Sequence, residues 1–217
     1  MIVDLNLQDK KVVVVGGGNE ALKRINSLLT QNCEIIVFSK KTNIAINKLA
    51  LSKKIKLQKR DIQGASFLSE LKPNMVITAT DDNSLNQKII KAAKKRKIIA
   101  YSVDNPDESD FSNPAIIDFE NTIKIAIFTG GKSPAMSKKL KAKSEKIFKK
   151  IITKKDIGQI KIQEIARKMA KEKIPTQVAR KEYISNIMND NKIDQLIKDG
   201  HFKKAEKRAI TILRNWK

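Results

Sequence analysis

The sequence predicts an α/β protein with a doubly wound parallel sheet, followed by a β-hairpin and a small helical domain. Three observations lead to this prediction. Up to Val103, short apolar runs alternate with amphipathic stretches, which favours parallel strands joined by helices. After Asn105-Pro106, two strand-like runs follow one another directly. From Ser133 onward the pattern is helical only.

The elements of the α/β part follow from apolar runs bounded by turn and cap residues. The first strand is a run of valines, and the fourth ends at Asp81-Asp82-Asn83, a turn that also begins a helix. In chain order we expect strand 11–15, helix 19–31, strand 34–38, helix 43–52, strand 55–58, helix 64–71, strand 75–79, helix 83–96 and strand 98–103.

The rest of the chain is expected to form a hairpin and a series of helices. The hairpin pairs residues 115–119 with 123–128 across a short polar turn. Gly158, Pro175 and Gly200 are interpreted as breaks between helices. The expected helices are 133–152, 157–173, 176–188, 192–198 and 202–216, and the expected domains are 1–113, a dimerisation element at 114–145 and a helical domain at 146–217.

A glycine turn joins the first strand to the first helix. Its spacing, Gly16-x-Gly18-x-x-Ala21, is typical of the Rossmann-like dinucleotide turn. In that turn free backbone N–H groups and the positive end of the helix dipole face a pyrophosphate. We therefore expect Gly16 and Gly18 to bind a dinucleotide. The alternative is a strand-to-helix turn without a ligand.

The end of the second strand leaves the choice of dinucleotide open. An acidic residue that would bind the ribose 2′-hydroxyl is missing there, and the chain reads Ser39-Lys40-Lys41 instead. Lys40 and Lys41 either favour the 2′-phosphate of NADP or border the adenosine pocket. Because the carboxyl ends of the first, fourth and fifth strands face one crevice, Thr80 and Asp81 are also expected to contact the cofactor.

Composition narrows the class of protein. The 217 residues carry 45 Lys and Arg against 23 Asp and Glu, a net charge of +22. This charge suits nucleic acid or a polyanionic small substrate, or it reflects a lysine bias. Nucleic acid is disfavoured because aromatic residues are only 5% and do not interleave with the lysines. With no long apolar run and no signal peptide, we expect a cytoplasmic protein that binds no membrane.

A second glycine turn follows the expected hairpin. It reads Thr129-Gly130-Gly131-Lys132 and runs into a helix start, with Ser133 as the N-cap and Pro134 at the first helical position. One interpretation is a plain connection between strand and helix. The other is a cradle for an anion.

Four sequence blocks resemble the precorrin-2 dehydrogenase family, the oxidase module of siroheme synthases. They occur in the family's order and spacing and cover roughly residues 1–150. The blocks are GGGNEALKR from Gly16, ITATDDNSLNQ at 77–87, VDNPDESDFSNPAI at 103–116 and IAIFTGGKSPAMSKKL at 125–140. The last two are much more specific than the glycine turn.

The resemblance implies oxidation of precorrin-2 by NAD⁺ to sirohydrochlorin, in the synthesis of siroheme or another modified tetrapyrrole. It implies cofactor contacts at Asn19 and Glu20 as well as at Lys40 and Lys41, and Asp104 as the general base. The homodimer is expected from the hairpin at 115–128, because a hairpin between two domains can serve as a dimerisation element. The implied substrate-binding residues are Thr129, Gly130, Gly131, Lys132 and Ser133. The substrate is a polycarboxylate, which matches the basic charge of the chain.

Two questions stay open at this stage. Some family members also insert ferrous iron, and the sequence leaves this activity open: His201 is the only histidine, and we expect no fixed metal site. The alternative function is an NAD(H)-sensing regulatory module without dehydrogenase activity. The chain contains no recognisable methyltransferase segment, so we expect precorrin-2 to come from another enzyme.

Overall fold

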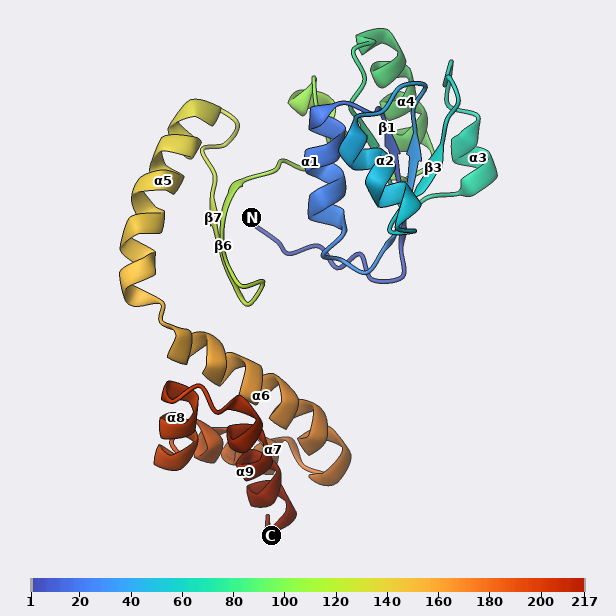
Figure 1. Cartoon of the computed structure of the whole chain (residues 1–217). Helices are drawn as coiled ribbons and strands as arrows, with labels where there is room; N and C mark the ends of the chain where they lie inside the picture. Colours follow the sequence, from blue (N-terminus) through green and yellow to red (C-terminus); the bar gives the residue numbers. More distant parts are fainter. Residues whose placement is uncertain (1, 217) are drawn as a thin grey trace. The chain divides into compact units, whose positions relative to one another are not determined.

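The computed structural model describes residues 2–216. The chain divides into two compact units, with the division between Asn113 and Pro114. Each unit is described by itself. Figure 1 shows the N-terminal unit in blue to green and the C-terminal unit in yellow-green to red.

The N-terminal unit contains one five-stranded sheet in which all neighbouring strands are parallel. The strand order is β3-β2-β1-β4-β5, so the direction of winding reverses between β1 and β4. Ligands of such sheets bind beyond the carboxyl ends of the strands at this reversal. The bounds are β1 Lys11–Val15, β2 Glu34–Phe38, β3 Lys56–Gln58, β4 Met75–Thr78 and β5 Ile99–Ser102. The predicted doubly wound sheet is confirmed.

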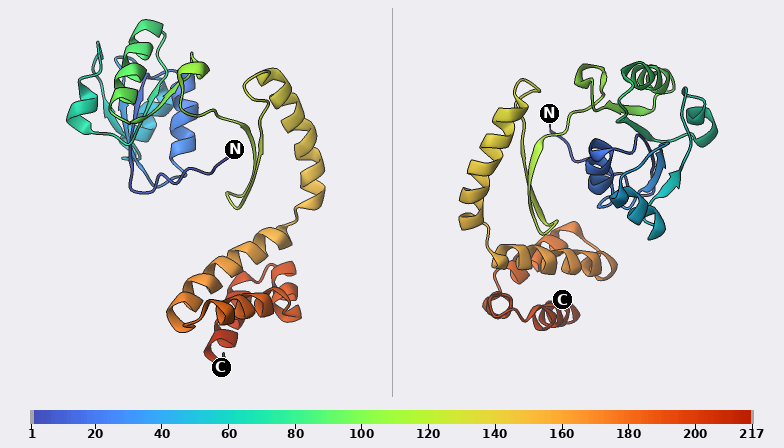
Figure 2. Two further views of the ribbon diagram at one scale, coloured as in Figure 1. Left: turned by 180° about the vertical axis from the view of Figure 1, so that it is seen from behind. Right: turned by 45° about the horizontal axis from the view of Figure 1, so that its top comes forward.

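Helices cover both faces of this sheet (Figures 1 and 2). Alternate valines of β1 explain the two layers, because successive side chains of a strand point to opposite faces. Val12 and Val14 pack with α1 and α2, whereas Val13 and Val15 pack with α3 and α4. The bounds are α1 Asn19–Leu28, α2 Ile44–Leu51, α3 Phe67–Leu71 and α4 Asn83–Lys95, and a short 3₁₀ helix, η1, spans Pro106–Glu108.

The C-terminal unit begins with the expected antiparallel hairpin. β6 (Ala115–Phe119) pairs with β7 (Ile123–Ile127), and both Glu120 and Asn121 in the turn have φ values of 53°. The long helix α5 (Pro134–Ile151) follows and packs against both strands. Its start is as predicted, since the Ser133 hydroxyl accepts a hydrogen bond from the Met136 N–H at 3.2 Å.

The remaining helices form a small bundle with its own core. They are α6 Lys154–Lys173, α7 Gln177–Met188, α8 Asn191–Lys198 and α9 Phe202–Arg214. Tyr183 lies at the centre of this core, fully buried, and its hydroxyl donates to the Ala209 carbonyl at 3.0 Å. Burial raises the pKa of Tyr183 to about 12.

The start predicted for the helix at 157 was wrong, and so was the interpretation of Gly158 as a break. α6 begins at Lys154, because Thr153 and Asp156 form a reciprocal capping box. Gly158 is therefore an internal helix residue. It is buried where α6 meets α8 and α9, and a Cβ built on it would lie 2.5 Å from Ile197 and 2.6 Å from the Phe202 ring. Close packing, and not a turn, explains this glycine.

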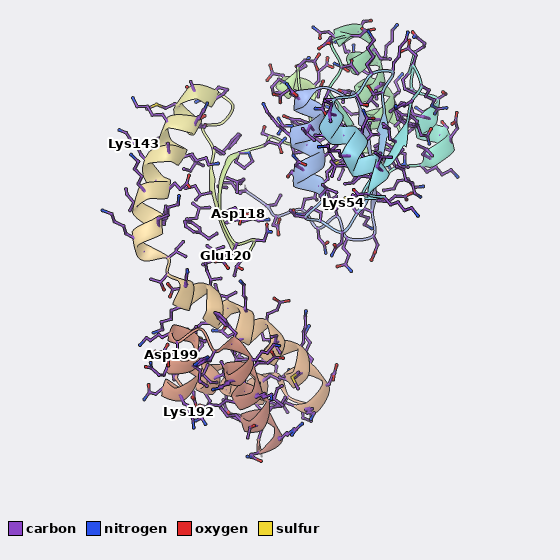
Figure 3. The ribbon with its side chains drawn as sticks, in the orientation of Figure 1. Lys54, Asp118, Glu120, Lys143, Lys192 and Asp199 are labelled. Carbon is purple, nitrogen blue, oxygen red and sulfur yellow. The ribbon has the colours of Figure 1, made fainter. Side chains whose placement is uncertain are left out.

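Charged side chains project from the surface of each unit in Figure 3, where Lys54, Lys143 and Lys192 are labelled. Acidic residues such as Asp118 and Asp199 are interspersed among them (Figure 3). The excess of positive charge is therefore carried by both units. Among residues 2–216, none of the helices has the length and apolar character that crossing a lipid bilayer requires.

Candidate functional site

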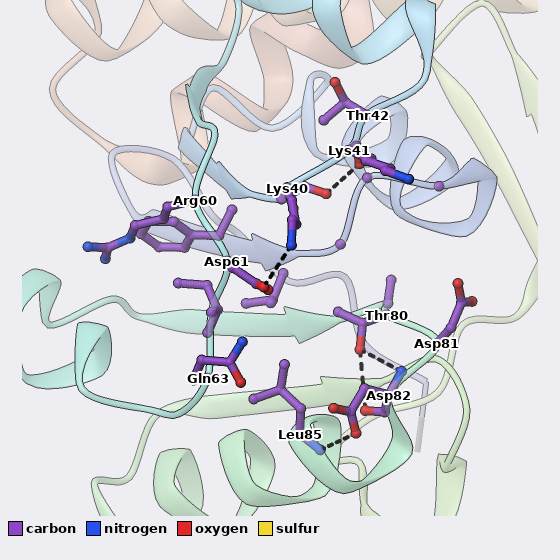
Figure 4. Close-up of a pocket in the computed structure, with 18 of the residues that line it drawn as sticks. Lys40, Lys41, Thr42, Arg60, Asp61, Gln63, Thr80, Asp81, Asp82 and Leu85 are labelled. Atoms are coloured by element: carbon purple, nitrogen blue, oxygen red, sulfur yellow. Dashed lines mark hydrogen bonds and ion pairs between the residues drawn. The ribbon is translucent and has the colours of Figure 1, made fainter.

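An open cleft of about 560 Å³ lies at the carboxyl ends of β1, β2, β3 and β4. This is the position that the strand order predicts for a ligand. Figure 4 shows the side chains that converge on it. The lining comes from four segments, at 15–18, 38–43, 60–63 and 79–82, together with Leu85.

Two glycines of the first turn are required by the chain itself. Gly16 has a φ of 129°, and a Cβ there would lie 2.2 Å from the Ala79 carbonyl oxygen. A Cβ at Gly17 would lie 2.2 Å from the Lys41 carbonyl oxygen. The turn is thus wedged between the ends of β4 and β2. Any side chain at either position would push these backbones apart.

Gly18 is different, because nothing in the chain requires a glycine there. Its φ is −82°, and a Cβ on it would have no neighbour within 4 Å. The residue is exposed and lines the cleft. A glycine at this point of a dinucleotide turn lets the backbone approach a pyrophosphate closely. The open space beside Gly18 fits that role.

The helix α1, whose N-cap residue is Gly18, has no side-chain cap. By contrast, the Asn43 side chain caps α2 by accepting from the Ile46 N–H, and the Asp82 side chain caps α4 by accepting from the Leu85 N–H, each at 2.9 Å. The first turn of α1 therefore keeps N–H groups that a phosphate can use. Together with the open position at Gly18, this end of the cleft fits the pyrophosphate of a dinucleotide.

The lysines after β2 lie at the cleft as predicted, but one of them is paired. Lys40 Nζ lies 3.4 Å from Asp61 Oδ2, and Figure 4 shows the Asp61 carboxylate turned toward this ammonium group. Asp61 belongs to the segment after β3, as does Arg60, whose guanidinium lies 4.5 Å from the centre of the Phe38 ring. The cleft therefore contains an acidic residue beside Lys40, but this residue follows β3 and not β2.

The segment after β3 was missed at the sequence level. Arg60, Asp61 and Gln63 all line the cleft. The sequence did indicate their position. A parallel strand was expected at 55–58, and the residues after it must lie at the same edge of the sheet as those after the other parallel strands.

Thr80 and Asp81 also line the cleft. The Thr80 hydroxyl donates to Asn86 Oδ1 at 2.7 Å, and the Asn86 amide returns a hydrogen bond to the Thr80 carbonyl at 2.9 Å. Since Asn86 is buried, this reciprocal pair fixes the turn between β4 and α4. Thr80 thus has a structural role in addition to its place at the cleft.

Asn19 and Glu20 lie on the first turn of α1, outside the residues that line the cleft. Glu20 pairs with Lys23 and lies 3.8 Å from Arg24. Asn19 accepts a hydrogen bond from the Asn43 side chain at 3.4 Å. The cleft therefore brings together Gly16, Gly18, Lys40, Lys41, Thr80 and Asp81 but not these two.

Asp104 lies in a separate, smaller hollow of about 300 Å³. The hollow adjoins the cleft across the start of α4, since Asp82 lines the cleft and Asn83 and Ser84 line the hollow. The exposed Asp104 carboxylate accepts a hydrogen bond from the Ser102 hydroxyl. Its other neighbours in the hollow are polar: Gln87, Asn105 and Glu108.

The second glycine turn belongs to the C-terminal unit. Gly130 and Gly131 have φ values of 65° and 76°, and neither has a neighbour within 4 Å of a built Cβ. The Thr129 hydroxyl lies 2.9 Å from the Ser137 hydroxyl and accepts from the Ser133 N–H at 3.3 Å. Lys132 is exposed. The segment is an open turn that enters α5, as predicted.

No group of three or more His, Cys, Asp or Glu side chains that could hold a metal ion occurs within the described residues 2–216. His201 stands at the N-cap position of α9.

The fold and the glycine turn define the class, a Rossmann-like dinucleotide-binding protein. A family described as putative NAD(P)-binding matches residues 3–115, and the chain belongs to this family. It is 33% identical over 206 residues to the siroheme synthase of Blochmanniella floridana, and 26% identical over 203 residues to that of Mannheimia succiniciproducens. Each alignment covers 93% of this chain but only 42% or 40% of the relative, so the chain spans about two fifths of their length.

A solved structure described as SirC, a precorrin-2 dehydrogenase, has the same fold. The two align with a TM-score of 0.70 over 100% of both chains, at 18% sequence identity. The comparisons confirm the resemblance to the precorrin-2 dehydrogenase family that the four sequence blocks indicated.

Proposed function

We propose that this protein is an NAD-dependent precorrin-2 dehydrogenase that forms sirohydrochlorin in siroheme biosynthesis. The observation that carries the proposal is the similarity to siroheme synthases over 93% of the chain, because it spans both the nucleotide cleft and the glycine turn at Thr129–Ser133. The relatives named here are biosynthetic enzymes, which favours an enzyme over an NAD(H)-sensing module. A cytoplasmic location, where NAD⁺ is available, is part of the proposal.

The reaction removes one hydride and one proton from the macrocycle and leaves a new double bond. Bound NAD⁺ supplies the hydride acceptor. The protein has to hold the cofactor, orient the macrocycle and take the proton. In this proposal Gly16, Gly18 and the start of α1 hold the pyrophosphate.

Asp104 is the proposed general base. It follows β5 at the carboxyl edge of the sheet, beside the start of α4, which also borders the nucleotide cleft. Its carboxylate is exposed and so can meet a substrate. A carboxylate within hydrogen-bonding reach of the reacting position can accept the proton.

The pairing of Lys40 with Asp61 supports NAD in preference to NADP. A 2′-phosphate at this side of the cleft would meet the Asp61 carboxylate, and it would compete with Asp61 for Lys40. A free 2′-hydroxyl, by contrast, can donate a hydrogen bond to a carboxylate. Asp61 thus supplies the acidic group that is absent after β2.

Thr129, Gly130, Gly131, Lys132 and Ser133 are proposed to bind carboxylates of precorrin-2. The two glycines leave the backbone open, and Lys132 is an exposed cation. Backbone N–H groups and a lysine are donors that suit carboxylates. The positive charge of the whole chain would also concentrate a polyanionic substrate.

A homodimer formed through the hairpin is also part of the proposal. The β6–β7 sheet has only two strands among the described residues, so each strand has an unpaired edge. α5, which packs on this hairpin, has no fully buried residue and exposes Met136, Ile147 and Ile151. A two-stranded sheet beside an apolar helix gains stability when a second copy covers it.

The central test is turnover by the Asp104→Asn variant. We expect the wild-type protein to form NADH when it is mixed with precorrin-2 and NAD⁺ without oxygen, read by absorbance at 340 nm. Asp104→Asn should lower kcat at least 100-fold, since general-base catalysis contributes about 10²–10⁴-fold. The dissociation constant for NAD⁺, measured by calorimetry, should stay within twofold.

Two outcomes would contradict this assignment. If Asp104→Asn retains turnover within a few-fold of the wild type, Asp104 is not the base. If the wild type binds NAD⁺ and NADH but forms no NADH from precorrin-2, the sensing module becomes the better description.

A further inference from the structure

Two buried hydroxyl groups lie directly behind Asp104. Thr78 ends β4 and Ser102 ends β5, and the two residues are register partners in the sheet. They are 0% and 2% exposed, next to a largely apolar layer. Their oxygen atoms lie 3.0 Å apart, and the Ser102 hydroxyl also contacts Asp104 Oδ1.

The chemistry of these groups fixes the direction of both hydrogen bonds. An ionised carboxylate can only accept, so the Ser102 hydroxyl must donate to Asp104. A hydroxyl has a single hydrogen, so the bond between Ser102 and Thr78 must then be donated by Thr78. The result is a directed chain from Thr78 through Ser102 to Asp104.

The backbone at the end of β5 is fixed as well. The Ser102 N–H donates to the Ser109 hydroxyl at 2.9 Å, and that hydroxyl donates to the Asn105 carbonyl at 3.1 Å. The segment that carries Asp104 is thus tied at both ends. Within residues 2–216, the Ser102 hydroxyl is the only hydrogen-bond partner of the Asp104 carboxylate, which leaves Oδ2 free of protein partners.

We infer that Thr78 and Ser102 are positioning residues for the reaction: they hold the Asp104 carboxylate by Oδ1 and leave Oδ2 to take the proton. This inference rests on the proposed role of Asp104 as the base. A proton acceptor contributes fully only when its angle and distance to the reacting atom are held. An exposed aspartate on a loop has several rotamers, and a buried donor that can reach only one of them reduces that freedom.

A purely structural role gives a different expectation. Thr and Ser side chains often pair across neighbouring strands, and such a pair adds to sheet stability. If the hydroxyls served only the sheet, their loss would lower the melting temperature and would disturb NAD⁺ binding and turnover together. A positioning role predicts a loss of kcat alone.

The test is the steady-state kinetics of Ser102→Ala with precorrin-2 and NAD⁺. We expect kcat to fall about tenfold, while KM for precorrin-2 and the calorimetric dissociation constant for NAD⁺ stay within twofold. Thr78→Val has nearly the volume of threonine but lacks the hydroxyl, so it should lower kcat by a smaller factor, about threefold. Thr78→Ser keeps the hydroxyl and should therefore retain the wild-type kcat.

Unchanged kcat in Ser102→Ala, or equal losses in Thr78→Val and Thr78→Ser, would overturn the inference. A parallel loss of NAD⁺ affinity and melting temperature would also overturn it, in favour of the structural role. If Ser102→Ala does not fold, the comparison of the two Thr78 variants decides. If the wild type itself forms no NADH, the proposed function has failed, whereas active wild type with unaffected variants refutes only this inference.

Discussion

Three consecutive glycines connect β1 to α1, and only two of them are needed by the fold. Gly16 and Gly17 would each bring a Cβ to 2.2 Å from a backbone oxygen, whereas Gly18 has free space around it and an ordinary φ. The same residue type therefore serves two purposes in adjacent positions. Packing explains the first two glycines, and in the proposed function access for the pyrophosphate explains the third.

The different roles of Gly16 and Gly18 predict opposite results for their alanine variants. Gly18→Ala should keep the melting temperature within about 2 °C and weaken NAD⁺ binding at least tenfold, because the methyl group fills the space of the pyrophosphate. Gly16→Ala should lower the melting temperature by several degrees. Thermal denaturation and calorimetry with NAD⁺ measure both. Unchanged NAD⁺ affinity in Gly18→Ala would refute the placement of the pyrophosphate.

At the level of single residues, most but not all of the residues that line the cleft could be predicted from the sequence. Gly16, Gly18, Lys40 and Lys41 were found because strand–turn–helix spacing places them at one edge of the sheet. Asp61 was missed although it follows the expected strand at 55–58, and its pairing with Lys40, 21 positions earlier, has no local pattern that would predict it. Likewise the hydrogen bond of Ser102 with Thr78 depends on the register of β4 with β5, which the sequence does not state.

Among the elements, α6 shows how packing can override helix propensity. Glycine costs an internal helix position about 1 kcal/mol relative to alanine. At Gly158, however, a methyl group would meet Ile197 and Phe202 at 2.5–2.6 Å. Overpacking of this kind costs about 1–3 kcal/mol.

We therefore expect Gly158→Ala to destabilise the helical bundle, although alanine is the better helix former. Urea denaturation followed by the fluorescence of Trp216, the only tryptophan, would measure this, since its ring lies 5.4 Å from that of Tyr183. Lys171→Ala, an exposed position of the same helix, is the matched control and should change stability by less than about 0.5 kcal/mol. A stabilised Gly158→Ala variant would show that the packing at this site is looser.

The start of α8 depends on one carboxylate. Asp190 accepts from the Ile193 N–H at 2.7 Å as the N-cap and binds the Arg208 guanidinium through both oxygens, at 2.7 and 2.6 Å. The hydrogen bonds from Arg208 hold the pKa of Asp190 below its ordinary value of 3.8. A lowered pKa stabilises the fold above the unfolded-state pKa, and this stabilisation is lost as the pH falls through the folded-state pKa.

Two substitutions at Asp190 separate the cap from the ion pair. Asp190→Ala removes both and should lower the free energy of unfolding by at least about 1 kcal/mol at pH 7. Asp190→Asn keeps a capping oxygen and should cost less. The difference between wild type and Asp190→Asn should shrink as the pH is lowered through 3.8 and below. A difference that stays constant down to pH 3 would contradict the role of the charge.

The elements themselves were largely predictable, and the errors have physical causes. The apolar runs of β1, β2, β4 and β5 predicted the sheet, and the caps of α2, α4 and α5 were visible as Asn43, Asp82 and Ser133. The start of α6 was missed because a helical glycine that packs against other helices has the same appearance in a sequence as a glycine that ends a helix.

For the whole molecule, the proposed dimer leads to a prediction about mass in solution. Ile116 on β6 is half-buried, and its neighbour across the hairpin is Ala126. Ile116→Lys should shift the protein from dimer toward monomer in sedimentation velocity, because a charge in a covered apolar surface is costly. Leu51→Lys is the control: this residue is 83% exposed on α2 and should leave the mass unchanged. A monomeric wild type would refute the dimer.

The wedged glycine turn is also bonded directly to the loop that follows β2. The Gly16 N–H donates to the Phe38 carbonyl at 2.9 Å, and the Gly17 carbonyl accepts from the Asn43 N–H at 3.0 Å. The loop expected to touch adenosine is thereby bonded to the turn expected to hold the diphosphate. Under the proposed function, a substitution that moves either segment would therefore alter nucleobase recognition and phosphate recognition together.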